Sequence, residues 1–359
     1  MTTRIDCDIH PSVGGTRTTL LPYLSDHWQE QVVSRAIDGL DLNSYPPNMP
    51  FSGRADWRRD GAKPAECPKT VAGHAFDELG SSVAVCNVLY GAQAVFDPYM
   101  AQDFCKAIND WIKAEWLDAD PRFRASMCVP MQAPDLVVHE INRLKDDKRF
   151  VSVLFLAQGD VPLGNRQWWP VYELAERLEL PITIHAGSAY RRAPSSIGWP
   201  SYRYEYYMVE SQAIQSQVMS MSLDGVFGKF PTLRVVLAES GVSWLPAFMW
   251  RANKTWRGVR VEVPWVDRQP SEILRESFRV TTQPFDCPND ATIVEQLIDQ
   301  IGSDEMFLFA SDYPHWQFEG NDPIPPHLPQ SLVKKMTVDN PLAAFPRLEL
   351  PNYCLLYTS

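Results

Sequence analysis

The chain has 359 residues, of which 45% are hydrophobic and 21% are charged, so it is long enough to bury a large core. Its formal net charge of -11 argues against a nucleic-acid backbone or an anionic membrane as the main partner, because both favour clustered Lys and Arg. No apolar run approaches the roughly 20 residues of a membrane-spanning helix, and the N-terminal residues lack the apolar run of a secretory signal. We therefore expect a soluble, cytoplasmic protein.

Seven cysteines are scattered along the chain without any C-x-x-C pair. An odd number without close spacing favours reduced thiols over a disulfide or zinc framework. Cys7, Cys86 and Cys128 fall inside predicted strands, so we expect buried thiols at these positions.

Short apolar, β-branched runs alternate with amphipathic segments through the chain. The runs, which we predict to be strands, are residues 5–9, 83–89, 125–129, 150–156, 181–184, 233–237, 278–282 and 306–310. The predicted helices include residues 98–116, 134–144, 168–178, 212–227, 245–259 and 292–301. This alternation predicts parallel β-α units, and eight of them predict an α/β fold of the closed (β/α)8 or TIM-barrel type. No G-x-G-x-x-G follows a strand, which argues against a dinucleotide-binding sheet.

Two segments are too long to be simple connections. Residues 41–75 are rich in Pro, Gly and charge, and residues 186–208 are rich in Arg and aromatic side chains. Long loops of this kind are functional lids, interface pieces or solvated insertions. We predict one barrel domain over residues 1–350 that carries these two insertions, followed by a disordered tail at 351–359.

Polar residues at the C-terminal ends of the strands are informative, because the active site of a (β/α)8 barrel lies there. At the end of the first strand, alternation places Asp6, Asp8 and His10 on one face, with the last two nearest the mouth of the barrel. The fifth strand leads into His185, and the eighth leads into Asp312. Imidazole and carboxylate together suit Zn²⁺, Mn²⁺ or Fe²⁺, so the coincidence of these residues predicts a metal centre.

Glu239 follows the sixth predicted strand and adds another carboxylate. It fits a metal ligand, a partner of a ligand or a base, and the sequence leaves these roles open. His74 lies in the first insertion, where a lid would bring it to the site. We expect the other histidines outside the strand ends, which are His27, His139 and His327, to be surface or packing residues.

Five motifs resemble those of the amidohydrolase-2 group in the amidohydrolase-related family, which includes aminocarboxymuconate-semialdehyde decarboxylase. They are the D-x-H at residues 8–10, His185-Ala-Gly, Glu239-Ser-Gly-Val-Ser-Trp-Leu-Pro, Val280-Thr-Thr-Gln-Pro and Ser311-Asp-Tyr-Pro-His. The resemblance spans residues 4–347. It implies a (β/α)8 barrel with one divalent metal ion, a homodimeric assembly, and the metal ligands Asp8, His10, His185 and Asp312.

The chain departs from the family pattern at two positions. Many members have H-x-H on the first strand, where this chain has Asp8 and His10, and many have a His where this chain has Glu239. An extra carboxylate lowers the net charge of the site and makes the ion a weaker Lewis acid. The fourth strand offers no Lys or Glu to bridge two ions, so we expect a single ion, with Zn²⁺ favoured and Mn²⁺ as the alternative.

The resemblance implies a small carboxylate substrate whose neighbouring oxygen reaches the metal. We expect non-oxidative decarboxylation of an aromatic or unsaturated carboxylate, with Asp312 as general acid. The alternative is hydrolysis of an ester, lactone or amide, with Asp312 or Glu239 accepting a proton from water. Both reactions use the same ligands, so the sequence decides neither between them nor which substrate is used.

Several residues near the second insertion are candidates for substrate contacts. Arg191, Arg192 and Arg203 carry guanidinium groups, which match a carboxylate bidentately. Trp199 and His315 are further candidates. Aromatic residues in the same part of the sequence suggest either a planar substrate or packing between loops, and these are Trp168, Trp169 and Tyr204.

Two other functional hypotheses are less favoured by the sequence. The first is a ligand-binding barrel with a structural metal, although structural zinc sites are closed by Cys and His rather than by carboxylates at a barrel mouth. The second is a metal-free glycosidase, which needs paired carboxylates, here at the ends of the fourth and seventh strands. The sequence has no such pair at those two positions.

Overall fold

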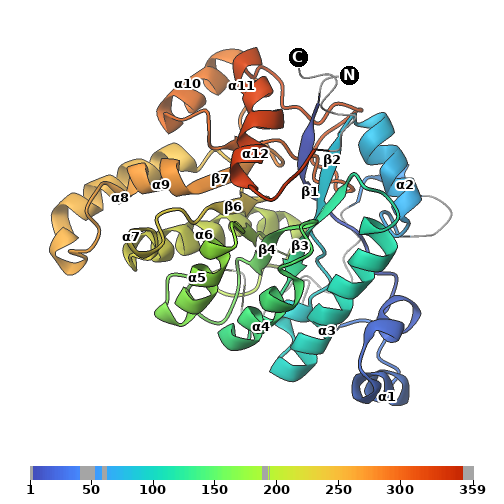
Figure 1. Cartoon of the computed structure of the whole chain (residues 1–359). Coiled ribbons are helices and arrows are strands. Elements are labelled where there is room, and N and C mark those ends of the chain that lie inside the picture. The colour runs from blue at the N-terminus through green and yellow to red at the C-terminus, as the bar shows by residue number, and fades with distance from the viewer. Residues whose placement is uncertain (1–2, 41–52, 59–62, 188–192, 194, 351–359) are drawn as a thin grey trace.

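The computed structural model describes residues 3–40, 53–58, 63–187, 193 and 195–350. Eight parallel strands form one sheet in sequence order (Figure 1). They are β1 (Ile5–Ile9), β2 (Val83–Cys86), β3 (Phe123–Cys128), β4 (Phe150–Leu156), β5 (Ile182–His185), β6 (Val235–Ala238), β7 (Phe278–Thr281) and β8 (Phe307–Leu308). Cys7 N donates to Phe309 O (2.9 Å) and Asp312 N to Asp8 O (3.1 Å), which joins the chain around β8 back to β1. The predicted (β/α)8 barrel is confirmed.

Helices surround the sheet, as the outer ribbons of Figure 1 show. They are α1 (Asp26–Ser34), α2 (Pro68–Ala72), α3 (Pro98–Trp111), α4 (Pro134–Leu144), α5 (Trp169–Arg177), α6 (Arg203–Leu223), α7 (Val226–Lys229), α8 (Leu245–Val259), α9 (Pro270–Ser277), α10 (Ala291–Ile301), α11 (Gln330–Lys334) and α12 (Asn340–Ala344). Capping side chains and prolines at the first turn determine where helices such as α3 begin. Asp97 caps α3 by accepting from the N–H groups of Tyr99 and Met100, and Pro98 occupies the first helical position, where its missing N–H costs nothing.

The second predicted insertion is shorter than expected. Helix α6 begins at Arg203, so residues 203–208 are helical rather than loop. Glu205 stabilises this start because its Oε2 accepts a hydrogen bond from Tyr202 N at 3.0 Å. No apolar stripe marks the first turns of α6, and periodicity alone therefore placed its start at residue 212.

The first predicted insertion also contains regular structure, since α2 and the helical turn Gly73–Glu78 lie at its C-terminal end. Part of this insertion packs on the chain after β8. Gly53 forms a bridge with His315, and Arg54 N donates to Pro314 O at 2.8 Å. The interpretation as a purely solvated insertion is wrong for these residues.

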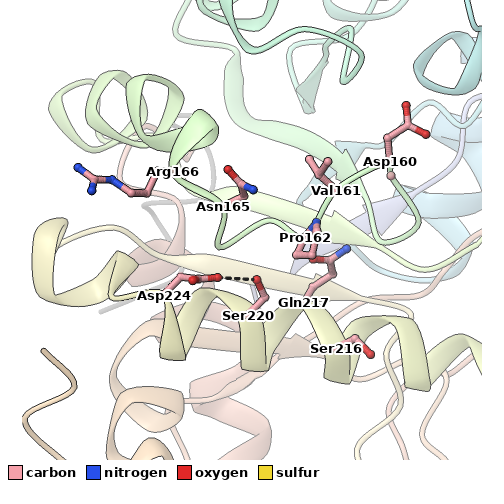
Figure 2. A pocket seen from close by; sticks show the side chains of 10 residues that line it. Asp160, Val161, Pro162, Asn165, Arg166, Ser216, Gln217, Ser220 and Asp224 are labelled. Atoms are coloured by element: carbon pink, nitrogen blue, oxygen red, sulfur yellow. Dashed lines mark hydrogen bonds between the residues drawn. The ribbon is translucent and has the colours of Figure 1, made fainter. Parts of the chain in front are cut away.

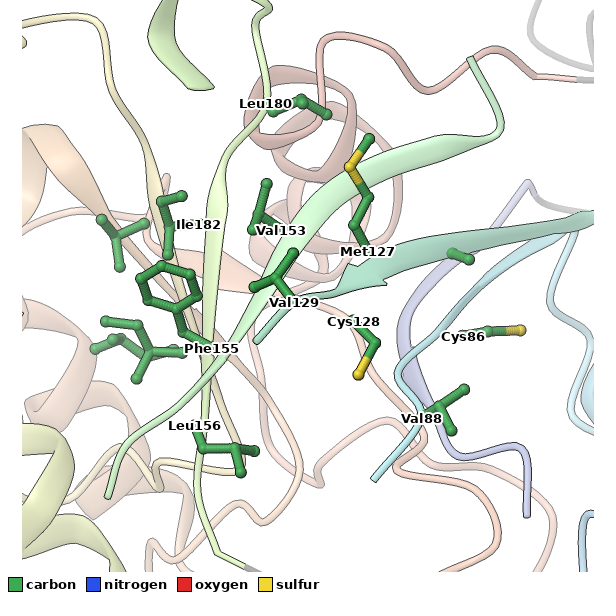
Figure 3. Close-up of a cluster of buried hydrophobic side chains, with 14 of the residues drawn as sticks. Cys86, Val88, Met127, Cys128, Val129, Val153, Phe155, Leu156, Leu180 and Ile182 are labelled. Carbon is green, nitrogen blue, oxygen red and sulfur yellow. The ribbon is translucent and has the colours of Figure 1, made fainter. Parts of the chain in front are cut away.

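Two hydrophobic clusters support the barrel. The larger one includes side chains from four neighbouring strands, β2 to β5, as Figure 3 shows. The smaller one joins residues of β1, β2, β4, β6 and β8 to Phe345 and Leu348. Because β4 and β8 are not neighbours in the sheet, these side chains meet across the interior of the barrel. The C-terminal segment thus helps to fill the N-terminal end, and the opposite end is left for a site.

The thiol prediction is confirmed for the strands, since Cys7, Cys86 and Cys128 are buried and free. Cys67 is free but exposed, so the expectation of buried thiols does not extend to it. In the part of the chain that the structure describes, no helix has the length and apolar character that a membrane span requires.

Candidate metal centre

Six side chains with metal-ligating groups meet at the C-terminal ends of the strands. The first two come from the end of β1, the third closes β5, the fourth follows β6, and the last two lie in the chain after β8. They are Asp8, His10, His185, Glu239, Asp312 and His315. All are buried except His315, which is partly buried. The barrel therefore brings together every residue that the strand-end rule singled out except Asp6.

Asp6 lies outside this cluster, deeper along β1 than Asp8 and His10. The register of β1 against β2 shifts between Asp6 and Ile9. The Oδ1 atom of Asp6 instead accepts hydrogen bonds from Ser311 N (2.9 Å) and Asp8 N (3.3 Å). Asp6 thus ties β1 to the chain after β8, and it supports the site rather than forming it.

The ligand atoms converge closely around His10. Its Nε2 lies 3.3 Å from Asp8 Oδ1, 3.2 Å from Glu239 Oε1 and 3.0 Å from Asp312 Oδ1. The His185 Nε2 atom lies 3.4 Å from Asp8 Oδ2 and 3.5 Å from Glu239 Oε1. Two overlapping four-residue groups result, which share His10 and Glu239. The first adds Asp8 and His185, and the second adds Asp312 and His315.

Five atoms of this cluster are buried and have no hydrogen-bond partner within the described residues. They are Asp8 Oδ2, His10 Nε2, His185 Nε2, Glu239 Oε1 and Asp312 Oδ2. Buried polar atoms are rarely left unsatisfied, because desolvation without a compensating partner is unfavourable. Oxygen and imidazole nitrogen atoms that converge in this way satisfy the ligand preferences of a divalent cation. The residues present therefore fit the metal that the family resemblance implies.

The histidine tautomers agree with this interpretation. Nδ1 of His10 lies 3.0 Å from the carbonyl oxygen of Asn87, and Nδ1 of His185 lies 2.6 Å from that of Ala186. Because a carbonyl oxygen only accepts, each Nδ1 must carry the hydrogen and donate it. Each Nε2 then presents its lone pair to the cluster, as a metal ligand requires.

The charges in the cluster shift the protonation of its members. Burial, reinforced by the charge of Glu239, raises the pKa of Asp312 to about 6. Burial by itself lowers the pKa of His315, but the charge and hydrogen bond of Asp312 outweigh it and raise this pKa to about 9. His315 Nδ1 and Asp312 Oδ1 are 2.6 Å apart. The two side chains thus form a hydrogen-bonded pair that holds a proton near neutral pH.

Two residues of the cluster have unusual backbone geometry. Glu239 and Asp312 have φ angles of 52° and 55°, in the left-handed region that non-glycine residues rarely occupy. Such conformations cost energy and persist where surrounding structure enforces them, commonly at functional sites. The turns after β6 and β8 are therefore shaped to aim these carboxylates into the cluster.

The predicted substrate-binding residues are only partly placed. Arg191 and Arg192 lie outside the described residues. Trp199 is 42% exposed. Trp168 is buried in the core and Trp169 packs against it, with ring centroids 5.1 Å from Phe155 and 6.0 Å from Phe230, respectively, which favours the packing alternative for both tryptophans.

Glu210, which the sequence did not single out, lies beside the end of β5. A side-chain carbon at Gly187 would come within 2.6 Å of Glu210 Oε1 and would overlap the Tyr206 hydroxyl, so α6 packs directly over this position. Burial, followed by the charge of Glu239, raises the pKa of Glu210 well above its usual range. The sequence gives no sign that this carboxyl group, in the middle of α6, lies buried beside the end of β5.

His74 supports the turn that carries the ligands after β8. Its Nδ1 lies 2.8 Å from the hydroxyl oxygen of Tyr313, and both side chains are buried. Trp57 packs on Tyr313 with ring centroids 4.7 Å apart. His74 thus contacts the neighbour of Asp312 and lies outside the ligand cluster itself.

A separate cavity of about 600 Å³ lies between the loop after β4 and α6 (Figure 2). None of the six cluster residues lines it. Its polar side chains bond to nearby protein groups: Ser220 Oγ donates to Asp224 Oδ2 at 3.1 Å, and Gln217 accepts from Leu163 N at 2.8 Å. The cavity lacks the convergent ligand atoms of the metal cluster, which remains the candidate site.

The burial of Asp6 gives a testable dependence of stability on pH. Burial raises its pKa to about 7, far above the value near 3.8 of an exposed Asp. The folded state therefore prefers the protonated form, so stability is full below pH 4 and falls as pH rises through 7. Three pKa units correspond to about 4 kcal/mol as an upper bound. In the metal-free protein, Asp6→Asn should flatten this loss, because an amide does not ionise, and its Oδ1 can still accept both backbone N–H groups. Urea unfolding at pH 5 and 8 measures the effect, and an unchanged pH dependence would contradict it.

Comparison with known proteins agrees with the barrel and its cluster. The chain is 26% identical over 262 residues to gamma-resorcylate decarboxylase from Polaromonas sp., covering 68% of this chain and 76% of that protein. It is 24% identical over 252 residues to 2-keto-4-carboxy-3-hexenedioate hydratase from Sphingobium sp., covering 66% and 65%, respectively.

Solved structures show the same fold. A dihydroxybenzoic acid decarboxylase from Polaromonas sp., with bound manganese and the inhibitor 2-nitroresorcinol, superposes with a TM-score of 0.66 at 20% identity, covering 96% of this chain and 97% of that one. An amidohydrolase from Mycobacterium avium subsp. paratuberculosis gives a TM-score of 0.72 at 18% identity, covering 96% and 98%. The amidohydrolase family model matches residues 5–347, nearly the whole chain. This protein belongs to the amidohydrolase family, as the strand-end motifs predicted.

Proposed function

We propose that this protein is a metal-dependent decarboxylase of a small aromatic or unsaturated carboxylate. The observation that carries the proposal is the convergence of five unsatisfied ligand atoms beside a hydrogen-bonded Asp312–His315 pair. The ligand cluster fits a divalent ion, and the pair fits the delivery of a proton. The activity of the resorcylate decarboxylases to which the chain is similar supports this choice.

Asp8, His10, His185 and Asp312 would hold the ion, with Glu239 as a further ligand or a base. When bound, the ion supplies Lewis acidity that stabilises negative charge on substrate oxygens. Three carboxylates in the cluster favour a hard ion, so we propose Mn²⁺ ahead of the Zn²⁺ expected from sequence. Glu239 lies in both ligand groups and Asp312 in only one, which makes Glu239 a strong candidate for the coordination shell.

Decarboxylation requires a proton at the carbon that loses CO₂. The carbon–carbon bond breaks, its electron pair stays on the substrate carbon, and CO₂ leaves. The carbon then takes a proton from a general acid. Asp312 is fully buried and faces the cluster, whereas the His315 side chain is 13% exposed. We propose that His315 takes up protons from solvent and Asp312 donates them, across their 2.6 Å hydrogen bond.

Hydrolysis is the second candidate reaction, and the ionisation of the Glu239 carboxyl group favours it. Burial by itself raises the pKa of Glu239, but the neighbouring His185, His10 and His315 outweigh it and lower this pKa well below the usual range. Glu239 is therefore an ionised carboxylate, which is the form that accepts a proton from water. The hydratase to which the chain is similar also uses water as a reactant, which supports water chemistry in this barrel.

Arg203 is the described arginine that best fits a clamp for a substrate carboxylate. It is partly buried, and its guanidinium lies 5.1 Å from the Tyr206 ring centroid and 5.3 Å from that of Tyr207. No ion pair of Arg203 is found within the described residues. Tyr207 in turn packs on Trp316, the neighbour of His315, at 5.5 Å, so this group adjoins the metal cluster. Arg191 and Arg192 remain proposed contacts, as do Trp199 and His315.

Arg203→Met should raise KM for the carboxylate substrate by about 10- to 100-fold with kcat nearly unchanged, because a charge-assisted hydrogen bond is lost while the apolar stem is kept. Steady-state kinetics measures both constants. Arg166→Met is the matched control, since Arg166 also lies over an aromatic ring, that of Trp169, away from the cluster. Equal KM values for the parent and Arg203→Met would remove Arg203 from the substrate site.

The proposed reaction is tested by product analysis of the purified protein loaded with Mn²⁺ or Zn²⁺. Dihydroxybenzoates and related unsaturated carboxylates are assayed for CO₂ release, and aryl esters and lactones for hydrolysis. Metal analysis of the same sample should give one equivalent per chain. CO₂ release without ester cleavage supports the decarboxylase, and the reverse supports the hydrolase. A protein that binds no metal after reconstitution would refute both.

We also propose that residues 1–350 form one domain and that the protein is a cytoplasmic homodimer. Large apolar side chains are exposed on and after α8, which projects from one side of the barrel (Figure 1). Trp250 is 57%, Val261 85% and Trp265 56% exposed, as is typical of interaction surfaces. Light scattering should give about twice the chain mass of 40.8 kDa. A monomer at micromolar concentration would contradict the dimer.

A further inference from the structure

Asn87, which lies outside the ligand cluster, contacts two of its members. It follows directly after β2 and is completely buried. Its Nδ2 donates to Asp8 Oδ1 at 2.7 Å, and its backbone carbonyl accepts from His10 Nδ1 at 3.0 Å. Its backbone N–H donates to Ile9 O at 2.8 Å. One residue thus holds three consecutive residues at the end of β1.

These contacts leave one free ligand atom on each of the two side chains. With Oδ1 of Asp8 engaged by Asn87, Oδ2 is left as a buried acceptor that has no hydrogen-bond partner in the described part of the chain. With Nδ1 of His10 donating to the Asn87 carbonyl, Nε2 is left with a free lone pair. Groups that bond to a metal ligand in this way orient it and tune its basicity.

The amide of Asn87 is not explained by packing. Its own Oδ1 is buried and accepts no hydrogen bond within the described residues. A residue that only filled this space would be apolar, because a buried amide oxygen without a donor is unfavourable. The contact that distinguishes Asn from an apolar residue here is the one from Nδ2 to Asp8.

We propose that Asn87 is a positioning residue of the metal centre, which orients Asp8 and His10 so that their free ligand atoms converge on one ion. The inference rests on the metal site of the proposed function and is independent of which reaction the ion supports. The side chain of Asn87 acts on Asp8 and its backbone acts on His10, so substitution removes only the first contact.

Asn87→Ala should weaken Mn²⁺ binding to the apoprotein by about 10- to 100-fold, as is usual when a partner of a metal ligand is lost. Isothermal titration calorimetry with Mn²⁺ alone measures this without any substrate. Asn109→Ala is the matched control. Asn109 is equally buried and donates to Cys128 O and Glu140 Oε1, so its loss should lower the melting temperature and leave Mn²⁺ affinity unchanged.

A double-mutant cycle separates positioning from general damage. If Asn87 acts through Asp8, then Asn87→Ala should cause no further loss of affinity in an Asp8→Ala background. An equal loss in both backgrounds, or an unchanged affinity in Asn87→Ala, would overturn the inference. Should Asn87→Ala fail to fold, Asn87→Ser leaves a smaller cavity and is expected to show the same loss. A parent protein that binds no metal would refute the proposed function itself, whereas a parent that binds Mn²⁺ isolates the role of Asn87.

Discussion

His185→Ala is expected to abolish metal binding and to lower kcat/KM by about 1,000-fold or more, because a Lewis acid contributes several kcal/mol to the transition state. His185 is completely buried, and its Nε2 faces Asp8 and Glu239 with no hydrogen-bond partner among the residues that the structure describes. Removing it takes away one nitrogen ligand and leaves two carboxylates to repel each other across a cavity. Metal analysis and steady-state kinetics on the same preparation measure the two effects.

His139→Ala is the control for this substitution, because His139 is exposed on α4 and belongs to neither ligand group. It should keep the metal and the activity of the parent. A His185→Ala protein that retains one full equivalent of metal would show that the ion is held by the group of His10, Glu239, Asp312 and His315 instead.

Asp312→Asn is expected to lower kcat by about 100- to 10,000-fold at saturating metal, the usual contribution of a general acid. Asn keeps the size of Asp and an oxygen that accepts from His315 Nδ1, but it cannot donate a proton to carbon. Metal content must be measured in parallel, since Asp312 is also a proposed ligand. Asp299→Asn on the exposed face of α10 is the control with the same chemical change.

The pH dependence of kcat gives an independent test of the Asp312–His315 pair. The pKa values are about 6 for Asp312 and about 9 for His315, so the pair holds one proton between these limits. The parent should show a bell-shaped profile, with both limbs moved to lower pH by a bound cation, whose positive charge disfavours protonation. Asp312→Asn should lose the acid limb. An unchanged acid limb in that variant would assign the ionisation near pH 6 to a group other than Asp312.

Local patterns were sufficient to predict much of the barrel. Residues 5–9 and 150–156 were expected as strands, and residues 134–144 and 245–259 as helices, and the structure has these bounds. Strand and helix periods are properties of short segments, so they can be read without knowing the partners. The rule that parallel strands end on one side of a barrel then placed His185 and Asp312 near each other, although 127 positions separate them in the sequence.

Other features depend on contacts that no local pattern records. Asn87 was hidden because the predicted second strand ran to residue 89, whereas β2 ends at Cys86 and leaves Asn87 at the strand end. The supporting role of Asp6 was also hidden, because the hydrogen bond that it accepts from Ser311 N joins residues 305 positions apart. The hydrogen bond between His74 and Tyr313 joins residues 239 positions apart.

The sequence by itself determined the fold class, the family and the candidate ligands, because periodicity and strand-end chemistry are local and repeat at every β-α unit. The tertiary structure alone decided which atoms of those ligands are free, that Asp312 and His315 form a pair, and that Asn87 orients the end of β1. The physical reason is that hydrogen bonds and burial arise between elements, through packing and strand register, and these exist only once the barrel closes.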